Sequence, residues 1–130
     1  MLRATPFLMF QGKARAALDF YAATLPDCTV EALTLVPEGE PAAGTVRMAT
    51  LVVAGQRFRV IDSPIPHAFD FTPSFSIFLD FDDAEALDRT FAALSEGGGV
   101  LMPLGNYGFS PRFGWLNDRF GVSWQMNLPG

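Results

Sequence analysis

Few side chains in this sequence have the chemistry of a catalytic group, and they do not form a known motif. The single histidine, His67, lies in the proline-rich stretch "SPIPHAFDFTP" (63–73). A histidine that acts as a general base needs an orienting partner, and Asp62 or Asp70 is close enough in the sequence to serve. Nothing in the sequence fixes that geometry. We therefore expect a solvent-facing loop histidine and leave the role of His67 open.

Four aspartates could suggest a catalytic carboxylate pair, but two of them have a simpler explanation. The four are Asp62, Asp80, Asp82 and Asp83. Free backbone N–H groups at the start of a helix favour a carboxylate, so Asp82 or Asp83 is expected to cap the helix that follows. No catalytic residue is assigned among them.

The one cysteine, Cys28, excludes an internal disulfide and fits a reducing compartment. It follows Pro26 and Asp27 at the predicted end of a helix. A cysteine in such a place is more often a small apolar filler than a nucleophile. The sequence also lacks a phosphate-binding loop, a nucleophile elbow and a Cys-x-x-Cys pair.

The acidic composition restricts the possible partners. The 130 residues carry a formal net charge of −5 and contain no run of lysine and arginine, which argues against a nucleic acid partner. No apolar stretch approaches the roughly 20 residues of a membrane span, and the N-terminus lacks the apolar core of a signal peptide. We therefore expect a cytoplasmic protein without a membrane partner. Its 49% hydrophobic content is typical of a globular domain with a real core.

The elements that must position any site are duplicated along the chain. The segments "AALDFYAATL" (16–25) and "EALDRTFAAL" (85–94) both have helical periodicity, and Ala17 and Ala86 lie 69 positions apart. Each follows an apolar strand, at 5–10 and 74–81. Each precedes strands with an Arg-Phe pair, at 52–61 and 115–124, and the two pairs lie 62 positions apart. This pattern predicts an α+β fold of two βαβββ modules.

The ends of these elements have local signals. Pro26 ends the first helix, and Gly97-Gly98-Gly99 ends the second because glycine readily takes the left-handed conformation there. The stretch 37–44 is expected to be an exposed hairpin loop. We predict a single domain over 1–130, with a first module of about 1–63, a connector at 64–73 and a second module of about 74–130.

Alternation along the predicted strands then separates two faces of a curved mixed sheet. The helix side takes Phe75, Ile77, Leu79, Phe81 and Trp124. The opposite side takes Arg59, Ile61, Ser63, Ser74, Ser76, Phe78, Asp80, Ser123, Gln125 and Asn127. The first strand is apolar on both faces, so Thr5, Phe7 and Met9 are placed on this side only by equivalence with the second copy. With the helices outside, this semi-polar inner side would form a cleft.

These residues also resemble a known family over nearly the whole chain. The early motif is Phe10-x-Gly12 followed by Ala17-Leu18-x-Phe20-Tyr21. The middle motifs are Pro66-x-x-Phe69-x-Phe71 and Met102-Pro103-Leu104. The closing motif is Phe113-Gly114-Trp115-Leu116-x-Asp118-Arg119-Phe120-Gly121-Val122-x-Trp124. With the paired modules, they resemble the vicinal oxygen chelate superfamily of glyoxalases, bleomycin-resistance proteins and dioxygenases. The closer match is its PhnB-like branch, often labelled 3-demethylubiquinone methyltransferase-like.

The resemblance implies where a metal would be bound. Metal-dependent members place His, Glu or Gln ligands on inward positions of four strands. Carried over by strand position, these sites fall near Thr5, near Ile61 or Ser63, at about Ser76 and at Gln125. Hydroxyl and aliphatic side chains are poor ligands for a divalent transition metal. We therefore expect no metal and no cofactor, and glyoxalase or dioxygenase chemistry is not favoured. Gln125 is expected to hydrogen-bond to a ligand or to Ser76.

The methyltransferase label has no support in the residues themselves. A site for S-adenosylmethionine in a doubly wound sheet needs a glycine-rich turn between a strand and the helix it opens. The glycines at 97–99 instead follow a helix. Methyl transfer is therefore not predicted.

The leading interpretation is a metal-independent small-molecule-binding protein that forms a homodimer. The candidate ligand-binding residues are Phe7, Met9, Arg59, Ser76, Phe78, Tyr107, Phe109 and Gln125. The stretch "PLGNYGFSPRF" (103–113) is a candidate lid whose aromatic side chains could stack on an apolar ligand. Two alternatives stay open: a resistance-type protein that sequesters an aromatic and cationic antibiotic, and an enzyme of unknown reaction that uses His67 or Tyr107 as acid or base.

Overall fold

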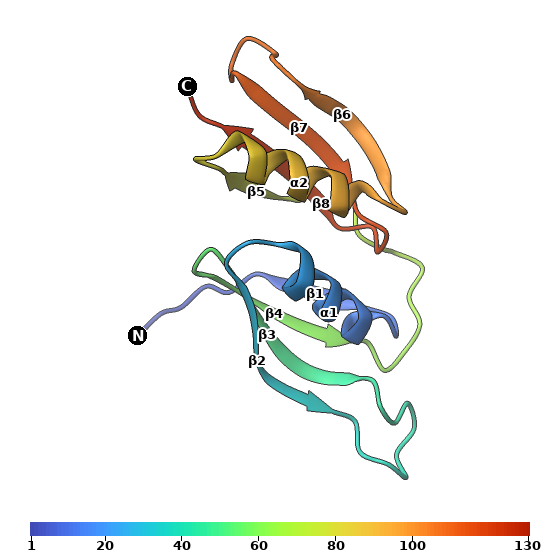
Figure 1. Ribbon diagram of the computed structural model, residues 1–130. Coiled ribbons are helices and arrows are strands. Elements are labelled where there is room, and N and C mark those ends of the chain that lie inside the picture. Colours follow the sequence, from blue (N-terminus) through green and yellow to red (C-terminus); the bar gives the residue numbers. More distant parts are fainter. The chain divides into compact units, whose positions relative to one another are not determined.

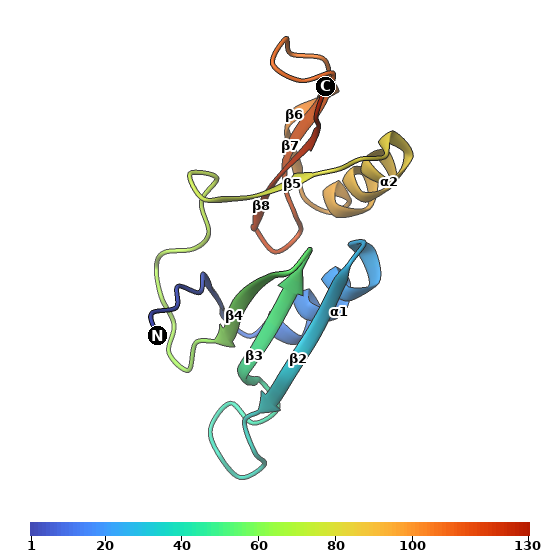
Figure 2. The same ribbon diagram turned by 90° about the vertical axis from the view of Figure 1, so that its left-hand side faces the viewer.

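The computed structural model describes residues 1–130, which separate into two compact units, Met1–His67 and Ala68–Gly130. We call them the first and the second module. Each contains a strand, a helix and three more strands, and each helix lies along one face of its own four-stranded sheet (Figures 1 and 2). The predicted α+β fold of two βαβββ modules is confirmed.

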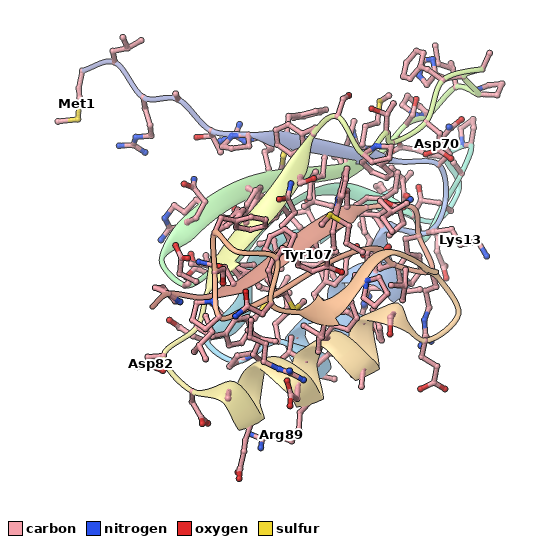
Figure 3. The ribbon with its side chains drawn as sticks, turned by 90° about the horizontal axis from the view of Figure 1, so that it is seen from above. Met1, Lys13, Asp70, Asp82, Arg89 and Tyr107 are labelled. Atoms are coloured by element: carbon pink, nitrogen blue, oxygen red, sulfur yellow. The ribbon has the colours of Figure 1, made fainter.

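The first module is a mixed sheet with its two central strands antiparallel. Its elements are β1 (Phe7–Phe10), α1 (Ala14–Thr24), β2 (Cys28–Leu35), β3 (Val46–Val53) and β4 (Gln56–Asp62). The strand order is β1-β4-β3-β2, in which β1 and β4 run parallel and the other pairs antiparallel. The residues before β1 extend away from the sheet, with Met1 at their end (Figure 3).

The second module repeats this arrangement. Its elements are β5 (Ser76–Asp80), α2 (Ala84–Ser95), β6 (Gly99–Gly105), β7 (Arg112–Asn117) and β8 (Ser123–Leu128). The order is β5-β8-β7-β6, with the parallel pair again at the edge strand that precedes the helix. Neither helix is long and apolar enough to cross a membrane.

The strand faces follow the predicted alternation because one side of each sheet packs on its helix. In the first module Leu8, Val60 and Leu51 are buried, whereas Phe7 and Arg59 are exposed. In the second module Ile77, Trp124 and Met126 are buried with the apolar stripe of α2. Phe75 is an exception: it was expected on the helix side, but it precedes β5 and is 54% exposed.

The start of α1 depends on a residue far away in the sequence. Lys13 at the N-cap offers no side-chain hydrogen bond. Instead, the buried carboxylate of Asp62, at the end of β4, accepts hydrogen bonds from the backbone N–H groups of Gly12 at 2.8 Å, Ala14 at 3.0 Å and Val46 at 2.9 Å. One side chain thus joins β4 to α1 and to β3, which explains why it is not a catalytic candidate.

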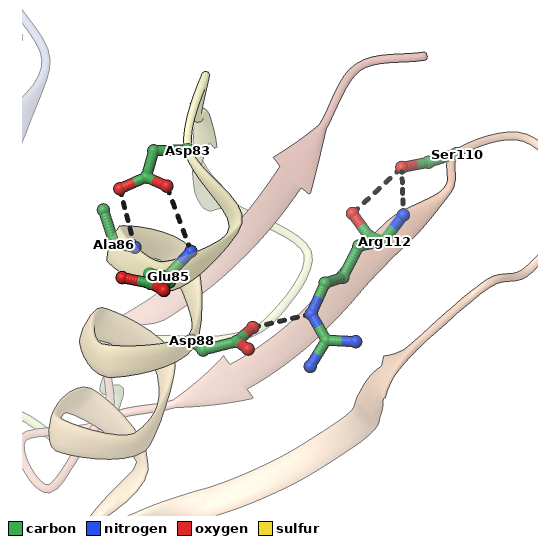
Figure 4. A network of polar contacts seen from close by, with 6 residues as sticks. All are labelled: Asp83, Glu85, Ala86, Asp88, Ser110 and Arg112. Atoms are coloured by element: carbon green, nitrogen blue, oxygen red, sulfur yellow. Dashed lines mark hydrogen bonds and ion pairs between the residues drawn. The ribbon is translucent and has the colours of Figure 1, made fainter.

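Helix α2 begins and ends on its own local signals. Asp83 caps it by accepting hydrogen bonds from the N–H groups of Glu85 and Ala86 (Figure 4). Of the two aspartates expected to cap this helix, the structure selects Asp83. Beyond the C-terminal end, Gly97 has a φ of +78°, in the left-handed region that favours glycine. The predicted stop is therefore confirmed.

Helix α2 also approaches its sheet closely. A Cβ atom on Gly114 of β7 would lie 2.5 Å from the ring of Phe91 on α2 and 2.8 Å from Leu104 on β6. On the same face, Arg112 Nε donates to Asp88 Oδ1 of α2 at 2.6 Å (Figure 4). The glycine and the ion pair set the distance between helix and sheet.

The last strands of the two modules, β4 and β8, are not aligned as the sequence repeat predicts. Val60 pairs with Leu8 in the first module, and Trp124 pairs with Ile77 in the second, so β4 and β8 are related by 64 positions. The Arg-Phe pairs, 62 positions apart, are therefore not equivalent. Arg57 and Phe58 lie in β4, whereas Arg119 and Phe120 lie in the turn before β8.

Candidate functional site

The face of the second sheet that points away from α2 carries most of the candidate residues. We call it the second far face. Strand register arranges it in three rows, each with one residue from β5, one from β8 and one from β7. The rows are Ser76–Ser123–Asn117, Phe78–Gln125–Trp115 and Asp80–Asn127–Phe113.

The first row is held by a continuous chain of hydrogen bonds. Trp115 Nε1, from the second row, donates to Ser123 Oγ at 2.8 Å, and Ser123 Oγ lies 2.7 Å from Ser76 Oγ. Ser76 Oγ can in turn donate to the backbone carbonyl of Pro73 at 3.3 Å. Each donor in this run of three hydrogen bonds has an acceptor, and no basic side chain contacts the hydroxyl of Ser76 or Ser123. The arrangement therefore positions Trp115 rather than activating a serine.

One polar atom at the end of this row has no donor. The side-chain oxygen of Asn117 is buried and makes no hydrogen bond. Most buried polar atoms in proteins have a partner, and an exception needs an explanation. This oxygen is an acceptor that a small donor molecule such as water could satisfy.

Gln125 has a different environment from the one expected. Its predicted partner, Ser76, is bonded to Ser123 instead, so the expected Gln125–Ser76 hydrogen bond is not formed. The side-chain amide of Gln125 makes no hydrogen bond within the protein, and the residue is only partly buried. It lies in register with Phe78 on one side and Trp115 on the other. A donor and an acceptor are therefore both available between two aromatic side chains.

The third row continues into an aromatic cluster. Asn127 Nδ2 donates to Asp80 Oδ1 at 2.8 Å, while Phe113 lies under a hairpin that joins β6 to β7. The ring of Phe113 is 5.0 Å from that of Phe109, 6.1 Å from that of Tyr107 and 6.2 Å from that of Phe78. Phe113 itself is buried, but Phe109 is 67% exposed and Phe78 is 50% exposed.

The hairpin is shorter than the stretch 103–113 expected for the lid. Strand β6 continues to Gly105 and β7 begins at Arg112, so only residues 106–111 connect them. Ser110 anchors the base of the loop, since its one hydroxyl proton is shared between the carbonyls of Arg112 at 3.0 Å and Leu128 at 3.1 Å. Tyr107 donates its hydroxyl proton to the carbonyl of Pro103 at 2.6 Å, and its ring stacks on Phe109.

The remaining candidates lie on the equivalent face of the first module, which points away from α1. Phe7 pairs in register with Arg59, and Met9 pairs with Ile61. We call the face formed by Phe7, Met9, Met48, Thr50, Val52, Arg57, Arg59 and Ile61 the first far face. Register makes Ile61 the equivalent of Gln125 and Arg59 the equivalent of Ser123. The two modules therefore present different chemistry at matching positions.

The structure gives His67 a partner that the sequence did not suggest. Its Nε2 lies 2.8 Å from Ser63 Oγ, and its backbone N–H donates to Gln11 Oε1. The expected orienting groups are occupied elsewhere: Asp62 binds three backbone N–H groups, and Asp70 accepts from the N–H of Phe71. Ser63 Oγ also lies 2.7 Å from the carbonyl of Ile65, an acceptor for its only proton.

Cys28 has the properties of a filler rather than a nucleophile. Burial, with a smaller contribution from the charge of Asp27, raises the pKa of the Cys28 thiol from 9.0 to about 11. The thiolate is the reactive form, so this thiol is weakly reactive at neutral pH.

The residues at the superfamily's metal positions do not fit a divalent metal. Thr5 is exposed, Ile61 is aliphatic, and Ser76 is engaged with Ser123, which leaves the neutral amide of Gln125. No three or more His, Cys, Asp and Glu side chains come together in a group that could hold a metal ion.

Comparison with known proteins decides the family. Residues 3–127 match the family model described as 3-demethylubiquinone-9 3-methyltransferase. The chain belongs to this family. The fold agrees: a solved structure described as a putative 3-demethylubiquinone-9 3-methyltransferase, PhnB protein, from Bacillus cereus is 43% identical with a TM-score of 0.92, covering 98% of this chain and 99% of that one.

Two further proteins are similar to this chain. Protein YjdN of Escherichia coli K12 is 28% identical over 142 residues, which cover 95% of this chain and 93% of YjdN. A glyoxylase/bleomycin resistance protein/dioxygenase domain from Frankia sp. EAN1pec is 12% identical with a TM-score of 0.71, covering 100% of this chain and 98% of that one. The latter likeness shows the fold alone, and it is the vicinal oxygen chelate fold predicted from the sequence.

The methyl donor that the family's description implies does not fit the residues present. Each sheet is four-stranded and mixed rather than doubly wound. The glycine triplet closes α2, and Gly98 packs against the backbone of Asn117, so these glycines do not cradle a ligand at the start of a helix.

Sequence reasoning missed part of the second far face. Trp115 and Asn117 lie on it but are not among the candidate residues, and Phe113 is included there only as an aromatic side chain of the candidate lid. Alternation along "RFGWLN" could have predicted this face. It places Phe113, Trp115 and Asn117 on one side of the strand and Arg112, Gly114 and Leu116 on the side of α2.

Proposed function

We propose that this protein binds a small organic molecule on the second far face. The observation that carries the proposal is the Gln125 amide, which lacks a protein partner and lies between Phe78 and Trp115. Ligand sites typically combine an apolar lining with a few polar groups that orient the ligand. An amide with both a donor and an acceptor, set between two aromatic side chains, is such a combination.

The aromatic cluster supports the same proposal. Phe78, Tyr107 and Phe109 expose ring surface around the buried Phe113. Offset or edge contacts between aromatic rings contribute about 0.5–1.5 kcal/mol beyond their buried area. An aromatic or otherwise flat apolar body would therefore gain from contact with this cluster while Gln125 binds its polar group.

The polar residues of the second far face support binding rather than nucleophilic catalysis. The serine hydroxyls are bonded to each other, to Trp115 and to a backbone carbonyl, and neither contacts a base.

The test uses 2-naphthamide as a probe. Its binding is monitored by an NMR titration that resolves the backbone amide signal of each residue. Wild-type protein should bind it with shifts at Phe78, Trp115 and Gln125, and Gln125→Leu should weaken binding about tenfold, the effect of losing about 1.4 kcal/mol of hydrogen bonding. Gln56→Leu is the matched control because Gln56 is exposed and lies in the first module. It should leave the affinity unchanged.

A second pair of variants tests the aromatic surface. Phe109→Ser should weaken binding of 2-naphthamide, whereas Phe75→Ser should not, because Phe75 is similarly exposed but lies outside the cluster. Titration shifts confined to the first module, or equal effects of Gln125→Leu and Gln56→Leu, would refute the proposal.

We also propose that the protein is a cytoplasmic homodimer. Each sheet has two edge strands, and large apolar side chains such as Ile65 and Phe75 are exposed. Sedimentation equilibrium at micromolar concentration should give twice the 14.2 kDa chain mass. A monomer at that concentration would contradict the dimer.

A further inference from the structure

The first far face holds an arginine that no carboxylate neutralises. Arg59 lies on β4, a central strand of its sheet, and its side chain makes no ion pair and no hydrogen bond within the protein. The other strand arginines are all paired. Their ion pairs are Arg47–Glu40 at 3.0 Å, Arg57–Glu31 at 2.8 Å and Arg112–Asp88 at 2.6 Å.

The neighbours of Arg59 explain why it stays unpaired. Its register partners are Phe7 on β1 and Thr50 on β3, neither of which carries a charge. The carboxylate in the same row, Glu31 on β2, is already bonded to Arg57. In a chain with 14 acidic and 9 basic residues, this guanidinium therefore faces uncharged side chains rather than one of the many carboxylates.

Apolar surface surrounds the guanidinium on the same face. Phe7 is 53% exposed beside it, and two residues further along the parallel pair lie Met9 and Ile61, both only partly buried. A planar guanidinium binds carboxylate, sulfonate and phosphate oxygens through two parallel hydrogen bonds, and it also packs on aromatic faces. Phe7 can thus contact both the cation and a ligand bound to it.

We infer that the first far face binds a small organic anion. Its oxyanion group pairs with Arg59, and its apolar body lies on Phe7, Met9 and Ile61. Charge complementarity selects this occupant, because a cationic ligand would be repelled by Arg59 and a purely apolar one would gain no pairing with this exposed guanidinium. The positive charge of Arg59 therefore argues against a cationic antibiotic as the ligand of this face.

This inference goes beyond the function proposed for the second far face. It uses none of that face's residues, so either proposal can fail without the other. A second copy of the chain could also supply a carboxylate to Arg59, and the experiment is designed to separate that outcome.

The test compares 4-phenylbutyrate with its neutral analogue 4-phenylbutyramide, again by amide-resolved NMR titration at pH 7. The acid should bind wild-type protein at least tenfold more tightly than the amide, with shifts at Phe7, Met9 and Arg59. Arg59→Met should abolish this preference, and Arg59→Lys should retain part of it because the charge remains but the two-pronged geometry is lost.

Arg15→Met is the matched control, since it removes the same charge from the same module at an exposed position on α1, away from the first far face. It should change the affinity for 4-phenylbutyrate by less than threefold. Spectra of the free variants establish that each is folded. Equal binding of acid and amide, or equal effects of Arg15→Met and Arg59→Met, would overturn the inference. Self-association that Arg59→Met abolishes and that 4-phenylbutyrate leaves unchanged would assign the face to a second copy instead.

Discussion

The thiol of Cys28 shows how a residue's surroundings decide its chemistry. Its pKa of about 11 leaves roughly one thiolate in a thousand at pH 8, so alkylation by iodoacetamide should be much slower than that of a free thiol. Asp27→Asn removes the smaller cause of the raised pKa and should increase the alkylation rate modestly. Mass spectrometry of timed samples measures both rates, and wild-type alkylation as fast as that of glutathione would contradict the prediction.

The same pKa shift has a direction for stability. The folded protein holds the Cys28 proton more tightly than the unfolded chain, whose thiol titrates near 9.0. The resulting stabilisation is fully present below pH 9 and is lost as the pH rises toward 11. The contribution of Cys28 to the free energy of unfolding should therefore fall between pH 9 and pH 11. A Cys28→Ala variant lacks this pH dependence, so the difference between its free energy of unfolding and that of the wild type measures the contribution.

Asp62 is the polar residue on which the first module most depends. Its carboxylate accepts three backbone hydrogen bonds in a buried place, and removing it would leave the N–H groups of Gly12, Ala14 and Val46 without that acceptor. We expect Asp62→Ala to lower the free energy of unfolding by about 3 kcal/mol. Urea denaturation measures the loss, and Asp62→Asn, which keeps one oxygen, should lose less.

Asp19→Ala is the control for this prediction. Asp19 lies on α1 and pairs with Arg15 at 3.7 Å in an exposed place, so its removal should change stability by about 0.5 kcal/mol or less. Comparable losses for Asp19→Ala and Asp62→Ala would show that the three backbone hydrogen bonds do not carry the stability assigned to them.

The role of Asp62 could not be predicted from the sequence, whereas that of Asp83 could. Asp83 caps the helix directly after it, and capping of this kind is a local signal. Asp62 reaches a helix that begins 48 positions earlier, and only the parallel pairing of β1 with β4 brings them together. The same limit applies to Ser76, whose partner Ser123 comes from the neighbouring strand and displaces the expected contact with Gln125.

At the scale of the elements, α2 packs on its sheet through a position that only glycine fits. Gly114→Ala would place a Cβ atom against the Phe91 ring and Leu104, which must shift. Overpacking of this kind typically costs about 1–3 kcal/mol. We expect a corresponding loss in urea denaturation together with NMR shifts at Phe91.

Gly99→Ala provides the matched control on the neighbouring strand β6. A Cβ atom there would meet nothing within 4 Å, so the free energy of unfolding should change by about 0.5 kcal/mol or less. If the alanine at 114 were tolerated as well as the alanine at 99, the close approach of α2 to β7 would not exist in solution.

Element boundaries show which patterns in the sequence were decisive. Apolar periodicity and the prolines and glycines at helix ends predicted both helices, and alternation predicted which strand residues face them. The extent of β6 was not predictable, because Pro103 interrupts the usual strand pattern yet is tolerated in an edge strand that need not donate a hydrogen bond. The hairpin that carries Tyr107 and Phe109 is consequently shorter than expected.

At the scale of the whole molecule, duplication preserves the fold while the exposed chemistry diverges. Buried positions keep their character, as in Leu8 and Ile77 or Val60 and Trp124, because each must pack on a helix. The far faces have no such constraint, and Arg59 and Ile61 in one module correspond to Ser123 and Gln125 in the other. The fold could therefore be predicted from repetition, whereas the candidate sites required the register of each sheet.

The net charge sets a final prediction about which anions this protein can bind. At pH 7 the chain carries −5, so a polyanion that covers many residues meets repulsion from carboxylates beyond Arg59. A small anion at the guanidinium is screened from those carboxylates, since the Debye length is about 8 Å at physiological ionic strength. Heparin at equal total charge should therefore fail to displace 4-phenylbutyrate, and the protein should pass through heparin resin at low salt. Displacement by heparin would show that the anion binds to a broader basic surface, which the paired state of Arg47, Arg57 and Arg112 argues against.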